Sequence, residues 1–450
     1  MLNRVGRRAI VLNVPITYPP EEVQGVMVSG VFVPHPAGES VIHPRQRFSE
    51  LSELLGECTL DLLYTQAWAD QDFEGILQEA TLTVEGWTRA SLHFMSEPGW
   101  DLCVVVFTET DRIQHRFWQW LSPEEGSHLS RENGNSRGRR EKLLDFYTNL
   151  DAHLGKMIAQ AGEETYIFIL SDHGFGGSKV RRKFYINSWL SSLGLFYPRH
   201  QPFRSLIRRI IQKFHPIRPF PDKNESSRQQ PGITSRLDMD WERSKVCYIG
   251  VESMGLYILR EPFGPVGAEE YEPLRKFLKR ELLALTDPAS RQRLVGNVFK
   301  REELYWGECL QEAPDLLFTL RGNQHGVSKS WKRKSRLFRD TRERGEGSHR
   351  PEGIMMMKGP GIKENTRLEE AQIIDIAPTL LYVLGVEIPG DMDGKVLLEA
   401  FQERHRANHP VRYAESSPKG ESTGSMEGES VYSEEELETI QKRLMDLGYL

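Results

Sequence analysis

The chain has 450 residues, of which 38% are hydrophobic and 27% are charged, a composition typical of globular proteins. Its formal net charge of -6 at pH 7 gives no overall attraction to nucleic acid, so we expect no specific nucleic-acid partner. No apolar run reaches the ~20 residues of a membrane-spanning helix, so no transmembrane segment is expected. The four cysteines, Cys58, Cys103, Cys247 and Cys309, show no CxxC spacing, which suits a reducing compartment and predicts a cytoplasmic protein.

Short apolar and β-branched runs alternate with amphipathic stretches, which predicts an α/β fold with a largely parallel sheet covered on both faces. The predicted strands are Ala9–Val14, Val26–Gly30, Leu102–Thr108, Thr165–Ser171, Gly255–Leu259, Asp315–Leu320 and Ile354–Gly359. The predicted helices are Phe48–Leu55, Phe73–His93, Lys142–Ala159, Tyr271–Leu285 and Ile373–Leu384. The runs VVVF and YIFIL are apolar at every position, as expected of strands buried on both faces.

Three segments interrupt this alternation. Residues 199–236 are rich in Pro, Arg and Lys, and we interpret them as an insertion or lid within an α/β domain formed by residues 1–405. Residues 328–344 contain eight Lys or Arg against two acids, so an anionic ligand could be steered by them. Residues 406–431 have the composition of a polar linker, and residues 432–450 are predicted to form a C-terminal helix.

Three motifs place metal-ligating residue types beside predicted strands. In LCVVVFTETDRIQH, Asp111 and His115 stand at i and i+4, so a helical turn there would point both side chains the same way. In YIFILSDHGFGG, Asp172 and His173 follow a second strand, and the glycines after them permit a tight turn. In GSHRPEG, His349 is expected in a loop flanked by glycine.

The carboxyl ends of parallel strands share one edge of a sheet, so Asp111, His115, Asp172 and His173 are expected to meet there. Together with His349 they form a set of oxygen and nitrogen ligands without thiolate, which suits Zn²⁺ or Mn²⁺, with Fe possible. Two such ions about 4 Å apart can hold both the attacking and the leaving oxygen of a phosphoryl transfer. Taken singly, Asp111 could be a helix cap and His115 a surface histidine, but their joint pattern favours a site.

The motifs TDRIQHRFW, LSDHGFGG, FYINSWLSSLGLF, GSHRPEGIMMMKGPGI and IIDIAPTLLYVLGVEIPGDMDGKVL follow one another in this order. Here the sequence resembles the type I phosphodiesterase and nucleotide pyrophosphatase branch of the alkaline phosphatase superfamily. The resemblance implies a three-layer α/β/α sandwich, two divalent ions, and a small anionic phosphate ester as substrate. One ion would be held by Asp111, His115 and His349, and the other by Asp172 and His173.

The sequence departs from this family pattern ahead of Asp111. In the family, an Asp from the first strand also binds the second metal, and an adjacent Thr or Ser attacks phosphorus. The first predicted strand here carries Asn13 near its end, and Thr17 lies between prolines without a partner Asp. The start MLNRVGRR has the pattern of a helix end, with Gly6 as its stop. We therefore assign no catalytic residue, expect the nucleophile upstream of Met1, and expect impaired activity.

Two other functions are compatible with the same residues. A protein that keeps the fold without catalysis could serve as a binding or regulatory module, and phosphomutase or sulfatase activity is possible on the same scaffold. Of the remaining polar residues, His325 in NQHGVS is predicted to be a loop histidine, and Asp375 in DIAPTLL to prepare a helix start. The sequence does not indicate the oligomeric state.

Overall fold

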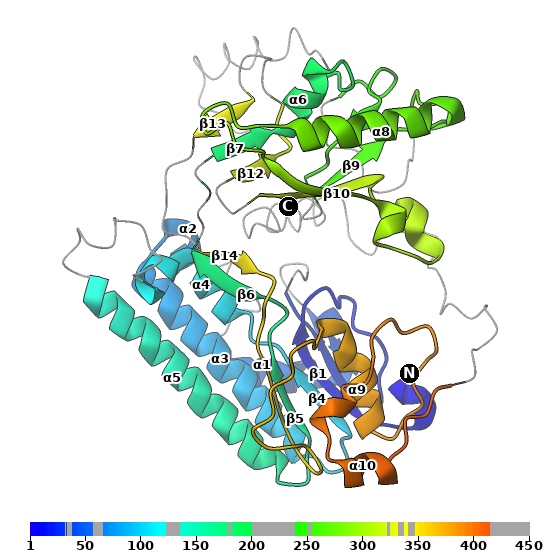
Figure 1. Cartoon of the computed structure of the whole chain (residues 1–450). Coiled ribbons are helices and arrows are strands. Elements are labelled where there is room, and N and C mark those ends of the chain that lie inside the picture. The colour runs from blue at the N-terminus through cyan, green and yellow to red at the C-terminus, as the bar shows by residue number, and fades with distance from the viewer. Residues whose placement is uncertain are drawn as a thin grey trace. The chain divides into compact units, whose positions relative to one another are not determined.

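A computed structural model describes residues 1–31, 33, 38–56, 66–122, 136–177, 180, 182–199, 239–250, 254–321, 325–331, 337–340 and 347–414. These residues fall into two compact units. Figure 1 shows the chain coloured from its N-terminus to its C-terminus. The first comprises described residues within Met1–Gly177 and Gly345–Leu447, and the second those within Ser178–Arg344. The predicted insertion beyond residue 199, the linker beyond residue 414 and the C-terminal helix lie outside the described residues.

The first unit is built on a four-stranded sheet with the order β3-β2-β1-β4. Its strands are β1 (Ala9–Val14), β2 (Gly25–Ser29), β3 (Ile42–His43) and β4 (Leu102–Val105). β1 pairs in parallel with both β2 and β4, and only the short β3 runs antiparallel. The largely parallel arrangement expected from the sequence is thus confirmed in this sheet.

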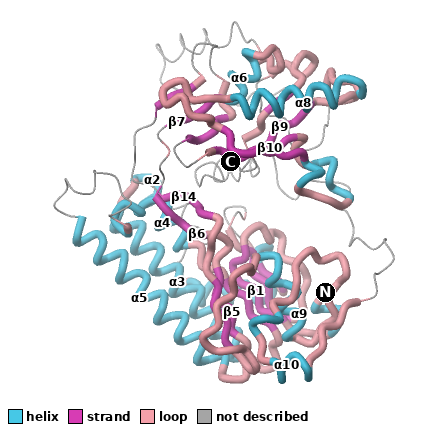
Figure 2. The backbone as a smooth tube through the Cα atoms, in the orientation of Figure 1, coloured by secondary structure: helices cyan, strands magenta, loops and turns pink. Residues whose placement is uncertain are grey.

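Helices cover both sides of these strands. Figures 1 and 2 show α3 and α5 on one side, and α9 and α10 on the other, which gives the expected three layers. Trp87 and Phe94 of α3 belong to the same buried cluster as Ile10 and Leu12 of β1. The helices of this unit are α1 (Phe48–Leu55), α2 (Gln66–Asp70), α3 (Phe73–Ser96), α4 (Glu109–Leu121), α5 (Ser136–Ala161), α9 (Ile376–Val383) and α10 (Glu403–Asn408).

The strands predicted from VVVF and YIFIL are shorter and less buried than expected. β4 is the last strand of its sheet, and all four of its residues are half-buried. β5 (Ile167–Leu170) pairs antiparallel with β15 (Met355–Lys358) and has no second neighbour among the described strands. An edge position explains the exposure, because one side of such a strand faces no other strand.

Two predicted turns are strands instead. The glycines after His173 form β6 (Gly174–Gly177), and His349 lies in β14 (Gly347–Arg350), which pairs antiparallel with β6. The glycines serve close packing here: a Cβ added to Gly174 would lie 1.9 Å from the carbonyl oxygen of Glu352. The expectation of a tight turn and a glycine-flanked loop was therefore wrong.

The second unit contains two sheets. The larger has the order β10-β11-β9-β8 with antiparallel neighbours, and the smaller has the order β12-β7-β13. Its elements are β7 (Arg182–Tyr185), α6 (Ile186–Ser192), β8 (Val246–Cys247), β9 (Gly255–Ile258), α8 (Ala268–Ala284), β10 (Val295–Lys300), β11 (Leu316–Leu320), β12 (His325–Ser328) and β13 (Phe338–Asp340). His325 thus lies in a strand and not in a loop, and the parallel pattern does not extend to the larger sheet.

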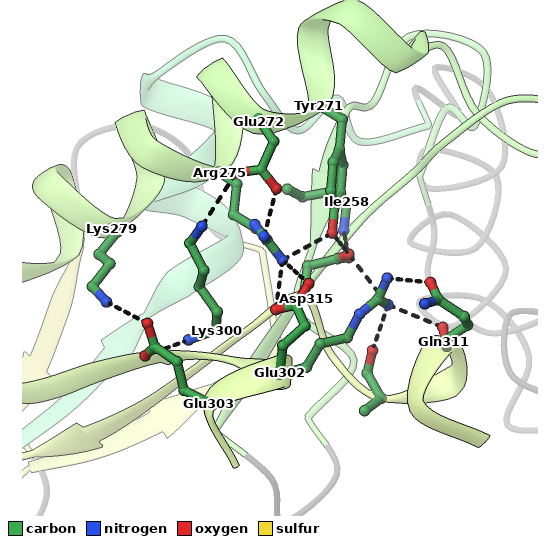
Figure 3. Close-up of polar contacts among 12 residues, drawn as sticks. Ile258, Tyr271, Glu272, Arg275, Lys279, Lys300, Glu302, Glu303, Gln311 and Asp315 are labelled. Carbon is green, nitrogen blue, oxygen red and sulfur yellow. Dashed lines mark hydrogen bonds and ion pairs between the residues drawn. The ribbon is translucent and has the colours of Figure 1, made fainter. Parts of the chain in front are cut away.

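A buried polar network joins α8 to this sheet (Figure 3). Asp315, which is 4% exposed, accepts hydrogen bonds from the backbone N–H of Ile258 at 2.6 Å and the hydroxyl of Tyr271 at 2.7 Å. The Arg301 guanidinium lies 3.4 Å from the same carboxylate and is itself buried. The carboxylate charge is therefore balanced inside the unit.

Candidate metal centre

The first two candidate ligands come from the start of α4. This helix begins at Glu109, four residues after β4 ends, so the predicted helical turn is confirmed. Asp111 and His115 lie one turn apart on it, with 3.4 Å between the Asp111 Oδ1 and the His115 Nε2. Both side chains are mostly buried.

His349 reaches the same point from β14. Its Nε2 lies 2.8 Å from the Nε2 of His115 and 3.2 Å from the Oδ1 of Asp111. The three residues can each offer one ligand atom within 4.8 Å of the others. Side chains more than 230 residues apart thus converge on one carboxylate oxygen.

His173 and Asp172 lie beside this group. The Nε2 of His173 is 3.8 Å from the Oδ1 of Asp111, and its ring stacks on that of His349 with centroids 3.8 Å apart. The Oδ1 of Asp172 is 3.6 Å from the same His173 Nε2, and the Asp172 side chain is 75% exposed. The structure therefore brings Asp111, His115, His349 and His173 together, and the exposed Asp172 contacts His173. The role of these residues as ligands stays a prediction.

Backbone carbonyl groups orient two of the imidazoles. The Nδ1 of His115 lies 3.3 Å from the carbonyl oxygen of Gly347, and that of His173 lies 3.0 Å from the carbonyl oxygen of Gly174. A carbonyl oxygen can only accept, so Nδ1–H donates in both cases, and in a neutral imidazole this tautomer leaves Nε2 as the metal-binding atom. Such outer hydrogen bonds are usual for metal-ligating histidines.

The environment favours the protonation states that metal ligands need. Burial lowers the pKa of His115 to about 4, against the opposite effect of the Asp111 charge. Burial alone would raise the pKa of Asp111, but the hydrogen bond with His349 and the charges of His115 and Arg112 lower it below its ordinary value. A carboxylate and a neutral imidazole are the forms that coordinate metal.

Sequence analysis missed two neighbours of the site. The Phe175 ring packs edge-on against His115 with 4.8 Å between centroids, and it also contacts His349. Arg112, which is 3% exposed, donates to the Oδ2 of Asp111 at 2.8 Å. Phe175 lies within the recognised LSDHGFGG string, but no spacing rule distinguishes either residue as part of a site.

A second group with metal-ligand chemistry, Glu50, His93 and Glu97, is explained without a metal. The Arg47 guanidinium donates to Glu50 at 2.6 Å and also pairs with Glu97. The hydrogen bond from Arg47 is the main reason that the pKa of Glu50 is lowered to about 2. A guanidinium already occupies the position that a cation would take, so we assign no metal site here.

The residues of the first group fit a divalent ion. The Nε2 atoms of His115 and His349 and the Oδ1 of Asp111 lie 2.8 to 3.4 Å from one another. Nitrogen and oxygen donors without sulfur suit Zn²⁺ or Mn²⁺.

Thr17, the hydroxyl considered as a nucleophile, is used locally. Its Oγ1 donates to the carbonyl oxygen of Val14 at 2.7 Å, in the turn after β1. Most of the basic segment 328–344 lies outside the described residues, so its steering role stays a prediction. Across the described part of the chain, no helix combines the length and apolar character that membrane crossing requires.

An α/β fold with Asp and His side chains clustered near the ends of its strands is an arrangement in which ligand sites commonly form. The chain belongs to the type I phosphodiesterase / nucleotide pyrophosphatase family, whose family model matches residues 6–349. All five candidate ligands lie within the matched residues.

Among solved structures, the chain is similar to human ectonucleotide pyrophosphatase / phosphodiesterase 5, with 13% sequence identity and a TM-score of 0.34. The match covers 73% of this chain and 62% of the human protein, so the chain spans less than two thirds of that protein's length. The comparison with curated proteins found no match.

Proposed function

We propose that the chain hydrolyses phosphate esters with the help of divalent ions bound at the Asp and His cluster. The observation that carries the proposal is the convergence of His115 and His349 on the Oδ1 of Asp111, with 2.8 Å between the two Nε2 atoms. Family membership supports phosphoester hydrolysis in general. We propose Zn²⁺ or Mn²⁺ as the ions and a small anionic phosphate ester as the substrate.

The five residues divide into two half-sites. Asp111, His115 and His349 would hold one ion, and Asp172 with His173 would hold a second, more weakly, because only two residues contribute there. Bound ions would supply Lewis-acid stabilisation of the phosphoryl oxygens. The protein would keep the His115 imidazole neutral through burial, orient His115 and His173 through the carbonyl contacts of Gly347 and Gly174, and limit water on the side of Phe175.

We assign no nucleophile among the described residues, and we expect weak turnover from this chain for that reason. We also propose a cytoplasmic location, which the free state of the described cysteines Cys103, Cys247 and Cys309 supports.

Metal analysis and activity assays together test the proposal. The purified chain is loaded with Zn²⁺ or Mn²⁺, its metal content is measured, and hydrolysis of p-nitrophenyl phosphate and bis(p-nitrophenyl) phosphate is followed with and without EDTA. We expect close to one tightly bound ion per chain and slow hydrolysis that EDTA abolishes. A chain that binds no divalent ion would overturn the proposal. Vigorous turnover that is lost in Asp172→Ala would overturn the expectation of weak activity.

A further inference from the structure

Arg112 follows Asp111 directly in the first turn of α4. Its side chain is 3% exposed, so contact with a substrate arriving from solvent is excluded. Its Nη1 donates to the Oδ2 of Asp111 at 2.8 Å. The other oxygen of the same carboxylate, Oδ1, lies 3.2 Å from the Nε2 of His349 and 3.4 Å from that of His115. The two oxygens of Asp111 therefore have separate partners.

We propose that Arg112 is a positioning residue for the metal centre: by holding Oδ2, it presents Oδ1 alone to the ion bound with His115 and His349. The inference rests on the proposed metal-dependent function. In this proposal the buried guanidinium of Arg112 fixes the orientation of one ligand atom, the Oδ1 of Asp111.

Geometry explains why such a residue is useful. A free carboxylate can rotate and can offer one oxygen or both to a metal, whereas a hydrogen-bonded one has a single orientation. The guanidinium is planar and always charged, so it holds an oxygen in a fixed direction more firmly than a neutral donor does. Contacts of this kind behind a ligand typically contribute 10–100-fold to metal affinity.

The positive charge of Arg112 repels a divalent cation, whereas its hydrogen bond orients the ligand carboxylate. These two effects predict opposite changes in metal affinity, which makes the proposal testable. The first turn of α4 carries two acids, the buried Glu109 and the partly exposed Asp111, against the single Arg112, so the turn keeps a negative balance that favours a cation. If orientation dominates, removing the guanidinium weakens metal binding. If repulsion dominates, removing it strengthens metal binding.

The test measures the Zn²⁺ affinity of the full chain by competition with a chromophoric chelator. Arg112→Met removes every donor, Arg112→Lys keeps one charged donor, and Arg116→Met is the matched control. Arg116 lies one turn further along α4, where it donates to the carbonyl oxygen of Trp68 at 3.1 Å and stacks over that ring. We expect Arg112→Met to weaken Zn²⁺ binding about 10–100-fold, Arg112→Lys to restore part of the loss, and the control to stay near the parent value.

A double-mutant cycle separates positioning from general structural support. In an Asp111→Asn background, Arg112→Met should have little further effect on Zn²⁺ affinity, because the carboxylate that Arg112 orients is gone. A purely structural role would give independent, additive losses. Additive losses, unchanged affinity, or tighter binding in Arg112→Met would each overturn the inference.

Failure of the inference and failure of the proposed function give different results. A parent chain without Zn²⁺ affinity contradicts the proposed function itself. A parent chain that binds Zn²⁺ while Arg112→Met binds equally well contradicts only the role of Arg112. Should Arg112→Met fail to fold, Arg112→Lys and Arg112→Gln replace it: affinity falling from the parent to Lys to Gln supports the inference, and equal affinities overturn it.

Discussion

The polar cluster of the first unit and the buried network of the second unit balance their acids in different ways. In the network, Asp315 faces the Arg301 guanidinium and the Tyr271 hydroxyl, so every acceptor meets a donor from the protein. At the candidate metal centre, Oδ1 of Asp111 meets imidazole nitrogens, of which His115 is held neutral by burial. Figure 3 shows the first arrangement, in which the cations are side chains.

The difference separates a structural ion pair from a ligand site. Burying a charge is costly unless it is paired, and a fold that supplies its own cation needs no other. At the metal centre the Arg112 guanidinium pairs with the Oδ2 of Asp111, while the Oδ1 faces imidazole nitrogens. In the group of Glu50, His93 and Glu97, the Arg47 guanidinium contacts both carboxylates, whereas Arg112 contacts a single oxygen of Asp111 and leaves Oδ1 to the imidazoles.

The largest effect is expected from breaking the network of the second unit. Asp315→Ala leaves the Arg301 guanidinium buried without its counter-charge, and removing one partner of a buried pair costs about 3–5 kcal/mol. Urea unfolding followed by circular dichroism measures the loss. A loss below about 1 kcal/mol would mean that the network does not need an internal counter-ion.

The metal-free centre should give a pH dependence of stability. The folded pKa of His115 is about 4 against an ordinary value of 6.5, so between these values the unfolded chain binds a proton that the folded chain does not. Stability should therefore fall as the pH drops from about 6.5 to about 4, by roughly 3 kcal/mol in all. Unfolding in EDTA across this range measures the slope. His115→Gln is the control, and an unchanged slope in that variant would contradict the assignment.

Removing a ligand should separate the two half-sites. His349→Ala should lower the affinity for the more tightly bound Zn²⁺ by at least about 100-fold, or about 2.8 kcal/mol. The reason is that even residues hydrogen-bonded behind a metal ligand contribute 10–100-fold to metal affinity. Asp172→Ala should change the affinity for that ion by less than about tenfold, since the Asp172 carboxylate belongs to the other half-site and is largely exposed. Chelator competition compares both variants. Equal losses would show that one ion uses both half-sites.

The smallest effect on stability is expected from breaking a solvent-exposed ion pair. Lys142 pairs with Glu74 at 2.6 Å, but the two side chains are 51% and 60% exposed. Lys142→Ala should cost less than about 1 kcal/mol in urea unfolding, because solvent already stabilises both charges. The loss should shrink further in 1 M salt. If Lys142→Ala lost as much stability as Asp315→Ala, burial would not explain the difference between the exposed and the buried ion pair.

The elements that the sequence predicted well are those with a strong periodic pattern. α1 has the predicted bounds, and α3 and α5 extend the predicted helices by a few residues at their ends. The position of Asp111 and His115 at the start of a helix was also predictable, because the strand before them ends abruptly in polar residues. Local pattern is sufficient where the structure depends on local contacts.

Other features depend on distant partners and were not predictable. His349 was assigned to a loop because glycines flank it, whereas β14 forms only because β6 lies alongside. β4 and β5 were expected to be fully buried, because an apolar run does not show whether a strand lies at an edge. Arg112 stands out only when its contact with the Asp111 Oδ2 is known.

The pairing of β6 with β14 also has a consequence for how the chain tolerates large insertions. Gly177 stands opposite Gly347, so the whole segment between them leaves and returns at one hydrogen-bonded pair. For the β6–β14 pairing, the segment between these two glycines acts as a closed loop, because the pairing holds its two ends together. The entropy cost of closing a loop rises only by about 0.6 kcal/mol for each doubling of its length. The length of that segment can therefore vary widely at little cost to the strand that carries His349.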